Sequence, residues 1–313
     1  MDFICGGLAA SGASIFSNPF DVLKTRMQLQ GELQAKGQHA IHYKNAFHAG
    51  YVVAKNEGIR GLQRGLGVAM TLHGVRNCVR LGSYQTLENH GFLTDSSGKT
   101  VLYKSAIASG VAGAIGAFCA SPLFLIKTQL QSQAAEQIAV GHQHGHRGTI
   151  SAITKIYYKY GIKGLWRGVN GTIIRAVAGS SSQLTTFAIS KDKLKENLYL
   201  RDSPMLTSLV ASIFSGFIQT IVINPFDVVS TRLYNQGVDA NGKGLFYAGV
   251  IDCFIKMVRT EGFAGFYKGV VANYMRLAPH SLFCLLFWDI LKGLKVRYID
   301  GGAKRSLLIE QNH

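Results

Sequence analysis

The feature that most constrains this chain is a threefold internal repeat. Three prolines stand in similar surroundings, SNPFDVLKTR, ASPLFLIKTQ and INPFDVVSTR, and each lies 103 residues after the one before. They are Pro19, Pro122 and Pro225. Further along each copy comes a second matched piece, EGIRGLQRG, YGIKGLWRG and EGFAGFYKG, which ends at Gly65, Gly168 and Gly269 respectively. Two motifs that recur three times in register indicate three tandem copies of one structural unit.

The repeat sets the expected organisation of the chain. We predict one repeat over residues 1–100, a second over 101–200 and a third over 201–297, followed by a polar C-terminal tail over 298–313. Soluble helical repeats have shorter units, typically 20–50 residues. A unit of this length, repeated only three times, favours another architecture.

Each repeat contains two long apolar segments. The first segments, 3–20, 105–126 and 203–226, carry no charged residue and have the length of a membrane-spanning helix. The second segments, 66–87, 169–190 and 270–291, are also apolar but contain arginines, so that hydropathy alone scores them poorly. We predict an all-α membrane protein with six transmembrane helices in three pseudo-symmetric repeats.

The charge of the chain fits a membrane protein better than a nucleic-acid-binding protein. The net charge is +16, but only 16% of residues are charged, and the basic residues lie between apolar segments rather than in one patch. They concentrate in 22–65 and 123–168, whereas 89–104 and 197–204 hold only Lys99, Lys104 and Arg201. The positive-inside rule therefore predicts the long loops on the matrix side and both termini on the opposite side.

Several other functions are not supported by the sequence. The five cysteines are scattered without a CxxC pair, and the N-terminus, MDFICGG, has no signal-peptide pattern. DSSGKT at 95–100 resembles the end of a phosphate-binding loop, but the glycine required five residues before Gly98 is Leu93. His142, His144 and His146 alternate as in metal-binding tracts, although such histidines are more often only solvated. We predict no enzyme activity, no metal site, no cofactor and no nucleic-acid partner.

The repeated motifs resemble those of the mitochondrial carrier family. PFDVLKTR at 19–26 closely fits the signature of that family, PFDVVSTR at 225–232 fits it partly, and SPLFLIKTQ at 121–129 fits it weakly. KTRMQLQGELQ, AVGHQHGH and TRLYNQG are similar to the branch that contains the fungal oxaloacetate carrier and solute carrier family 25 members 34 and 35. The resemblance implies a six-helix bundle with short matrix helices and a central cavity that opens alternately to either side. It also implies the mitochondrial inner membrane, antiport, function as a monomer, and cardiolipin as a structural lipid.

The same resemblance implies a gate on the matrix side. It pairs Asp21 with Lys127 and Asp227 with Lys24, and it makes Gln28 and Gln131 braces below these ion pairs. The third pair would join Phe124 and Ser230, so both of its charges are absent together, which avoids an uncompensated charge. We therefore expect a gate of two ion pairs.

On the opposite side the family's aromatic-acid-x-x-base element is intact only once, at Trp288–Lys292, with Asp289 as its acid and Lys292 as its base. Gln85 and Lys191 occupy two of the matching positions and could form a hydrogen bond. Asp289 would face Glu88, which is repulsive. We expect a weak cytoplasmic gate.

The arginines of the second segments predict an anion site. Positions on the three second segments can be counted from Gly65, Gly168 and Gly269, the last glycines of the second motif. Seven residues later lie Leu72, Arg175 and Arg276, eleven later lie Arg76, Gly179 and His280, and fifteen later lie Arg80, Gln183 and Cys284. Residues four apart share one helix face, and an arginine at mid-membrane must face water or a ligand. Because the uncharged segments offer no acid, we expect these arginines to bind a small organic anion. The expected contacts are Arg76, Arg175, Arg276, His73, Arg80, Ala176 and Gln183.

Planar guanidinium groups suit carboxylate or phosphate. The sequence therefore predicts a transporter of a di- or keto-carboxylate such as oxaloacetate, or of a related phosphorylated acid. Two alternatives stay open: an uncoupling-type proton-leak protein, and a carrier for inorganic sulfate or phosphate.

Overall fold

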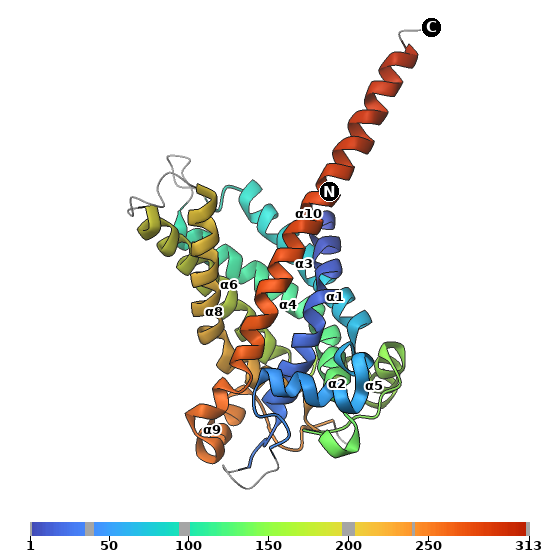
Figure 1. The fold of residues 1–313 in the computed structure, drawn as a ribbon, viewed down its shortest axis with the longest axis vertical. Helices are drawn as coiled ribbons and strands as arrows, with labels where there is room; N and C mark the ends of the chain where they lie inside the picture. Colours follow the sequence, from blue (N-terminus) through green and yellow to red (C-terminus); the bar gives the residue numbers. More distant parts are fainter. Residues whose placement is uncertain (1, 35–40, 94–100, 196–203, 240–241, 311–313) are drawn as a thin grey trace.

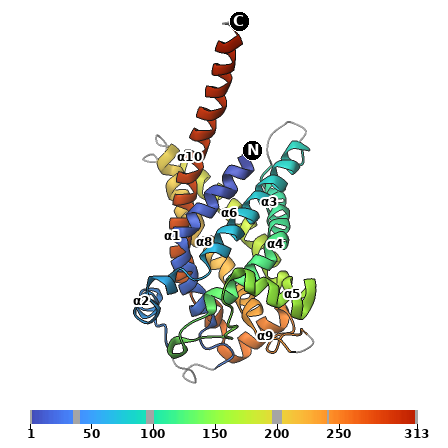
Figure 2. The ribbon, with the colours of Figure 1, turned by 90° about the vertical axis from the view of Figure 1, so that its right-hand side faces the viewer.

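Six long helices form the body of the protein in a computed structural model that describes residues 2–34, 41–93, 101–195, 204–239 and 242–310. They are α1 (Asp2–Leu29), α3 (Leu66–Asn89), α4 (Leu102–Ser132), α6 (Val169–Lys195), α8 (Pro204–Asn235) and α10 (Val270–Glu310). Figures 1 and 2 show them side by side as a bundle. The described part contains no β-strand beyond one isolated bridge, so the predicted all-α membrane fold is confirmed. Residues 95–100 and Arg201 lie outside the described residues.

Three shorter helices lie at one end of the bundle. They are α2 (Ala46–Leu62), α5 (Thr149–Leu165) and α9 (Val250–Glu261), one in each repeat. Figure 1 places the start of α1 and the end of α10 at the opposite end. Gly58, Gly161 and Gly262 have φ values of 68°, 67° and 70°, a left-handed conformation that glycine adopts without steric cost. These three glycines are the G of the repeated EG, YG and EG pairs, and they explain that part of the motif.

The six long helices contact one another in a closed order. α1 packs against α3, α3 against α4, α4 against α6, α6 against α8, α8 against α10, and α10 against α1. Small residues allow the close approach: the Cα of Gly7 faces Cys78, and Gly74 faces Ser11. The ring has one sparse contact, between α8 and α10.

The first helix of each repeat is longer than the sequence indicates. The uncharged segments end at residues 20, 126 and 226, whereas the helices continue through their prolines to Leu29, Ser132 and Asn235. Each signature acid and base therefore lies within a helix, between two and seven residues beyond the proline. In addition, α10 continues to Glu310, so the segment assigned to a polar tail is helical as far as that residue.

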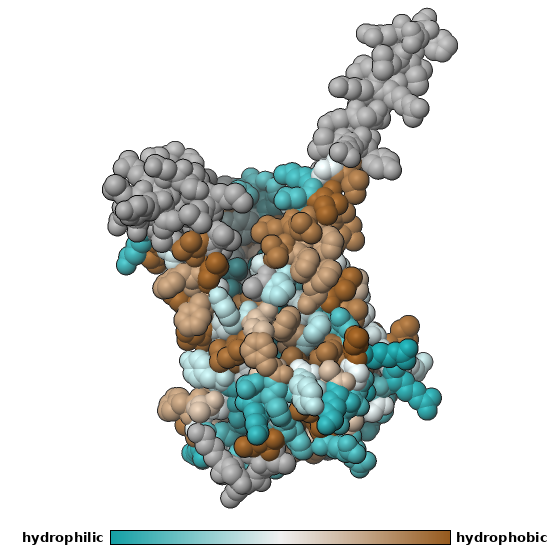
Figure 3. All heavy atoms as spheres, in the orientation of Figure 1, coloured by the Kyte–Doolittle hydropathy of each residue, from teal (hydrophilic) through white to brown (hydrophobic). Residues whose placement is uncertain are grey.

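The surface of the bundle is apolar in its middle. Figure 3 shows apolar side chains around the long helices and hydrophilic ones at the end that carries the short helices. Exposed apolar residues of the long helices include Leu8, Ile107, Phe214, Phe217 and Leu282. Among described residues, three segments are long and apolar enough to cross a membrane by composition alone: Tyr103–Ser132, Ile213–Asn235 and Phe263–Leu294.

Candidate functional site

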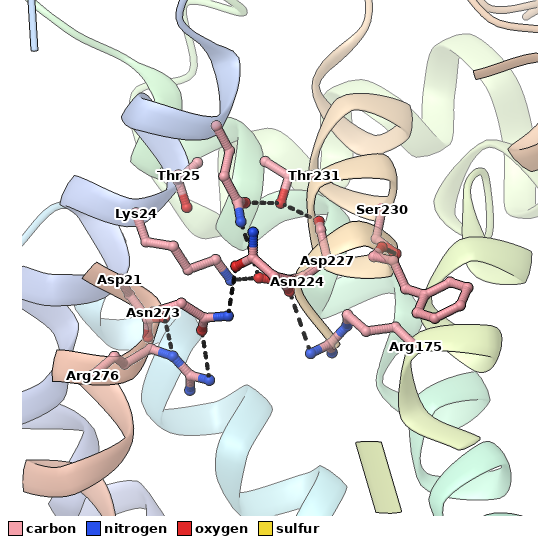
Figure 4. A network of polar contacts seen from close by, with 12 residues as sticks. Asp21, Lys24, Thr25, Arg175, Asn224, Asp227, Ser230, Thr231, Asn273 and Arg276 are labelled. Carbon is pink, nitrogen blue, oxygen red and sulfur yellow. Dashed lines mark hydrogen bonds and ion pairs between the residues drawn. The ribbon is translucent and has the colours of Figure 1, made fainter. Parts of the chain in front are cut away.

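Two buried ion pairs join the helices near the end that carries the short helices, and Figure 4 shows one of them, between Lys24 and Asp227. Lys127 Nζ on α4 donates to Asp21 Oδ2 on α1 at 2.9 Å. Lys24 Nζ on α1 lies 2.6 Å from Asp227 Oδ2 on α8. All four residues are buried, and these are the two pairs that the resemblance predicts. Their action as a gate stays a prediction.

The third gate position holds an arginine from the cavity instead of an acid–base pair. Arg175 on α6 lies with its guanidinium carbon 5.0 Å from the centre of the Phe124 ring, while its Nη1 is 3.5 Å from Asp227 Oδ1. Ser230, the other residue at this position, donates instead to the carbonyl of Phe226. A cation–π contact and an ion pair of Arg175 thus stand where the third bridge would be.

The two predicted glutamine braces behave differently. Gln28 Nε2 donates to Asp227 Oδ2 at 3.1 Å and therefore contacts one of the ion pairs directly. Gln131 accepts from Thr25 and donates to Asn18, and among the described residues it forms no hydrogen bond to a gate charge. Tyr234, the third residue of this set, bonds through its hydroxyl to Ser121 and Thr172.

The arginines of the cavity are not without acids, which corrects the expectation from the sequence. Arg276 Nε on α10 lies 3.4 Å from Asp21 Oδ1, and Arg175 contacts Asp227 as above. The expectation was wrong because Asp21 and Asp227 follow the uncharged segments by one residue, and the helices continue through them. Each gate acid consequently lies between a lysine of the next helix and an arginine of the cavity.

His73 and His280 lie beside this network. Their ring centres are 4.8 Å apart, and His73 Nε2 is 4.0 Å from Asp21 Oδ2. His280 Nδ1 is 3.2 Å from the hydroxyl of Ser17. Neither nitrogen of His73 has a hydrogen-bond partner among the residues that the structure describes, and its side chain is buried.

Arg76 and Arg80 stand further from the ion pairs. The Nε of each is buried without a hydrogen-bond partner in the described part of the chain. Ala176 is half-buried beside Arg175, and Gln183 is exposed.

The described residues at the opposite end of the bundle form no comparable network. Gln85, Asp289 and Lys292 are exposed, and Asp289 and Lys292 form no ion pair with any residue that the structure describes. The side chain of Lys191 lies outside the described residues. Among the described residues, the buried ion pairs between the long helices therefore lie at the end that carries the short helices.

A second set of ion pairs was missed from the sequence. Arg26 donates twice to Glu57, at 2.7 and 2.9 Å, and joins α1 to α2. Arg232 and Glu261 form the equivalent contact between α8 and α9. The recurring glutamate of the EG pair, 31 residues after the last signature base in the first repeat, was the available signal.

The three histidines of the loop before α5 are less solvated than the sequence predicts. His146 is buried and His144 is partly buried, while His142 alone is exposed. Neighbouring rings pack against each other at 4.6 and 5.6 Å between centres. No group of three metal-ligating side chains occurs among the described residues.

Known proteins with similar sequences were compared with the chain. The family profile described as "Mitochondrial carrier protein" matches residues 1–93, 98–198 and 201–298. Solute carrier family 25 member 35 of Mus musculus is 47% identical over 298 residues, which cover 95% of this chain and 99% of that protein. The mitochondrial oxaloacetate transport protein of Saccharomyces cerevisiae is 41% identical, with 92% and 87% covered. The mitochondrial citrate transporter E of Aspergillus niger is 38% identical, with 97% and 98% covered.

Proposed function

The chain belongs to the mitochondrial carrier family, a family of transporters and not of enzymes, and we propose that it carries a dicarboxylate such as oxaloacetate. Membership makes it a multi-pass protein of the mitochondrial inner membrane and a carrier of small anions. The substrate, the exchange mode and the residues that perform transport are the proposal.

The observation that carries the proposal is that Arg175 and Arg276 each contact one carboxylate. Arg175 lies 3.5 Å from Asp227, and Arg276 lies 3.4 Å from Asp21. A substrate with two carboxylates can occupy both arginines at once and replace the two aspartates there. A monocarboxylate can replace only one.

This exchange of partners gives a mechanism for opening. When a dicarboxylate neutralises the two arginines, Asp21 keeps its contact with Lys127, and Asp227 keeps its contacts with Lys24 and Gln28. Each aspartate then loses one of the two positively charged groups that contact it. The closed end is weakened only when substrate is bound, which couples opening to transport and favours antiport.

The two alternatives make different use of the same cavity. A proton-leak protein would pass current without exchanging an anion, and an inorganic-anion carrier would accept sulfate or phosphate in place of a carboxylate. The similarity to relatives named for oxaloacetate and citrate transport favours the carboxylate.

Further parts of the proposal rest on the family resemblance and on charge. The basic residues around the short helices favour the matrix for that end and the intermembrane space for both termini. The carrier works as a monomer. Cardiolipin, which carries two phosphates, suits the groove between Arg64 on the first repeat and Arg147 before α5.

The test is radiolabelled uptake into proteoliposomes loaded with a panel of di- and tricarboxylates, keto acids, phosphoenolpyruvate, sulfate and phosphate. Arg175→Ala and Arg276→Ala are measured beside Arg259→Ala, an exposed arginine on α9 that serves as the matched control. We expect uptake of dicarboxylates by the wild type and by the control variant, and its loss in both cavity variants. Uptake that persists in both cavity variants would contradict the proposal, as would a proton current in place of anion exchange.

A further inference from the structure

The three repeats differ in a carboxylate near the end of each short helix. In the first repeat, Glu57 binds both Arg26 and Arg64, at 2.7 and 3.3 Å. In the third repeat, Glu261 does the same for Arg232 and Lys268, the latter at 2.6 Å. Each of these two repeats therefore holds one carboxylate between two cations.

The second repeat lacks the carboxylate but keeps a cation. The equivalent residues are Gln129, Tyr160 and Arg167, so that Tyr160 stands where the glutamate is expected. Arg167 Nη2 still donates to the carbonyl of Gln236 at 3.4 Å, but its Nε is buried without a partner among the described residues. The second repeat therefore has no carboxylate at the position that Glu57 and Glu261 occupy in the other two repeats.

A cavity of about 180 Å³ occupies that position. Gln129, Tyr160 and Arg167 line it, together with the histidine loop and α5. Lys155 and Lys159 also line the cavity, and because they are four residues apart on α5 they share one face of that helix. No aspartate or glutamate lies among its described lining residues, so the site is strongly cationic and repels a metal ion.

One lining group accepts a hydrogen bond instead of donating one. Gln129 Nε2 donates to the carbonyl of Tyr234, which fixes the orientation of the Gln129 amide. Gln129 Oε1 then lies 3.0 Å from His146 Nε2. Because an amide oxygen can only accept, the proton of the His146 imidazole lies on Nε2. Burial, with Lys155 nearby, lowers the pKa of His146 and keeps the ring neutral. His146 Nδ1 is therefore a lone-pair acceptor, and it has no partner in the described part of the chain although the residue is 9% exposed.

We propose that this cavity binds hydrogen phosphate. Its oxygens would accept from Arg167 Nε and from the two lysines, and its remaining P–O–H would donate to His146 Nδ1. Sulfate offers the same tetrahedral charge without an O–H at neutral pH, and the phosphodiester of a lipid lacks the O–H as well. Inorganic phosphate thus takes the place of the carboxylate that the second repeat lacks, at a site separate from Arg175 and Arg276.

Calorimetric titration of the purified full chain in detergent at pH 7.5 tests the assignment, with inorganic phosphate and sulfate as the probes. The double variant Lys155→Gln/Lys159→Gln removes two charges from the exposed side of the cavity. Lys163→Gln is the matched control, because Lys163 is an exposed lysine of the same helix and does not line the cavity. Arg276→Ala reports separately on the central cavity.

We expect phosphate to bind the wild type, Lys163→Gln and Arg276→Ala alike. The double variant should bind it at least about tenfold more weakly, since a charged hydrogen bond is worth at least the 1.4 kcal/mol of a tenfold change. Sulfate should bind the wild type about tenfold more weakly, because His146 Nδ1 would then face an acceptor without a proton.

Three results would overturn the assignment. They are no phosphate binding by the wild type, equal binding of sulfate and phosphate, and unchanged binding in the lysine double variant. If binding is lost in Arg276→Ala and retained in the double variant, phosphate occupies the central cavity. That last outcome would support the inorganic-anion alternative for transport. The proteoliposome uptake of dicarboxylates would then test the dicarboxylate proposal separately.

Discussion

The Nη1 atom of Arg175 lies 3.5 Å from Oδ1 of Asp227. Asp227 also contacts Lys24 at 2.6 Å, so one carboxylate is shared between a gate lysine and a cavity arginine. Asp21 is shared in the same way between Lys127 and Arg276. Any anion that binds the arginines changes the electrostatic environment of the gate.

The pairing of Asp21 with Lys127 can be tested by charge exchange. We expect Asp21→Lys and Lys127→Asp each to abolish uptake, because breaking a buried ion pair costs about 3–5 kcal/mol. The double exchange should restore uptake only in part, since a lysine at position 21 would face Arg276 and His73. Initial uptake rates measure this, and a double variant no better than either single variant would refute the pairing.

The peripheral pair of Arg26 and Glu57 should make stability depend on pH. Burial alone would raise the pKa of Glu57, but the hydrogen bonds and charge of Arg26 outweigh burial and lower that pKa below its usual value. A lowered pKa stabilises the fold above the pKa of the unfolded chain, about 4.3, and the stabilisation is lost as pH falls through the folded-state pKa.

Glu57→Gln should therefore lower the melting temperature at pH 7 and converge with the wild type below pH 4. The exposed Glu136→Gln is the control and should change little at either pH. Thermal unfolding in detergent measures both variants. An equal loss for Glu57→Gln at pH 7 and below pH 4 would mean that its charge does not stabilise the fold.

Close approach of α1 and α3 should depend on Gly7. A Cβ there would overlap Cys78 Sγ and lie 3.0 Å from the carbonyl oxygen of Gly74. We expect Gly7→Val to reduce the yield of folded protein severely. Gly82→Ala on α3, where a Cβ meets nothing within 4 Å, should instead be neutral or stabilise by about 0.5–1 kcal/mol. Normal thermal stability of Gly7→Val would contradict this packing.

The weak cytoplasmic gate predicts a contrast between the two ends of the bundle. Asp289 is exposed and unpaired among the described residues, so Asp289→Asn should change the free energy of unfolding by less than about 0.5 kcal/mol. Asp227→Asn should destabilise by about 3 kcal/mol or more, because it leaves Lys24 without its buried partner. Similar losses for the two variants would show that both ends are closed by charge.

The repeat was sufficient to predict the six helices and the face that carries Arg175 and Arg276, whereas the ion pairs of Asp21 and Asp227 with lysines were predicted from the family resemblance. Repeats fix register, and register fixes which residues meet between equivalent helices. The sequence did not show that α1 and α8 continue beyond their prolines, because the polar residues that follow Pro19 and Pro225 resemble a helix end. For that reason the contacts of the arginines with the gate acids were missed.

The histidine loop was hidden for another reason. Alternating histidines in a polar segment are usually solvated, and nothing local indicates that His146 is buried against Gln129. The available signal was a comparison among repeats, in which Tyr160 replaces a glutamate and Gln129 replaces an arginine. A departure from internal symmetry marks a place where one repeat has its own chemistry.

The measurement that tests the central claim most directly is the initial rate of labelled oxaloacetate uptake by Arg175→Ala and Arg276→Ala, each compared with the wild type and with Arg259→Ala. If the two arginines hold the two carboxylates of the substrate, both cavity variants lose at least about tenfold in rate while the control keeps it, since each loses a charged hydrogen bond. If both cavity variants transport oxaloacetate as fast as the wild type, the substrate does not bind between Arg175 and Arg276, and the account of gate coupling is wrong.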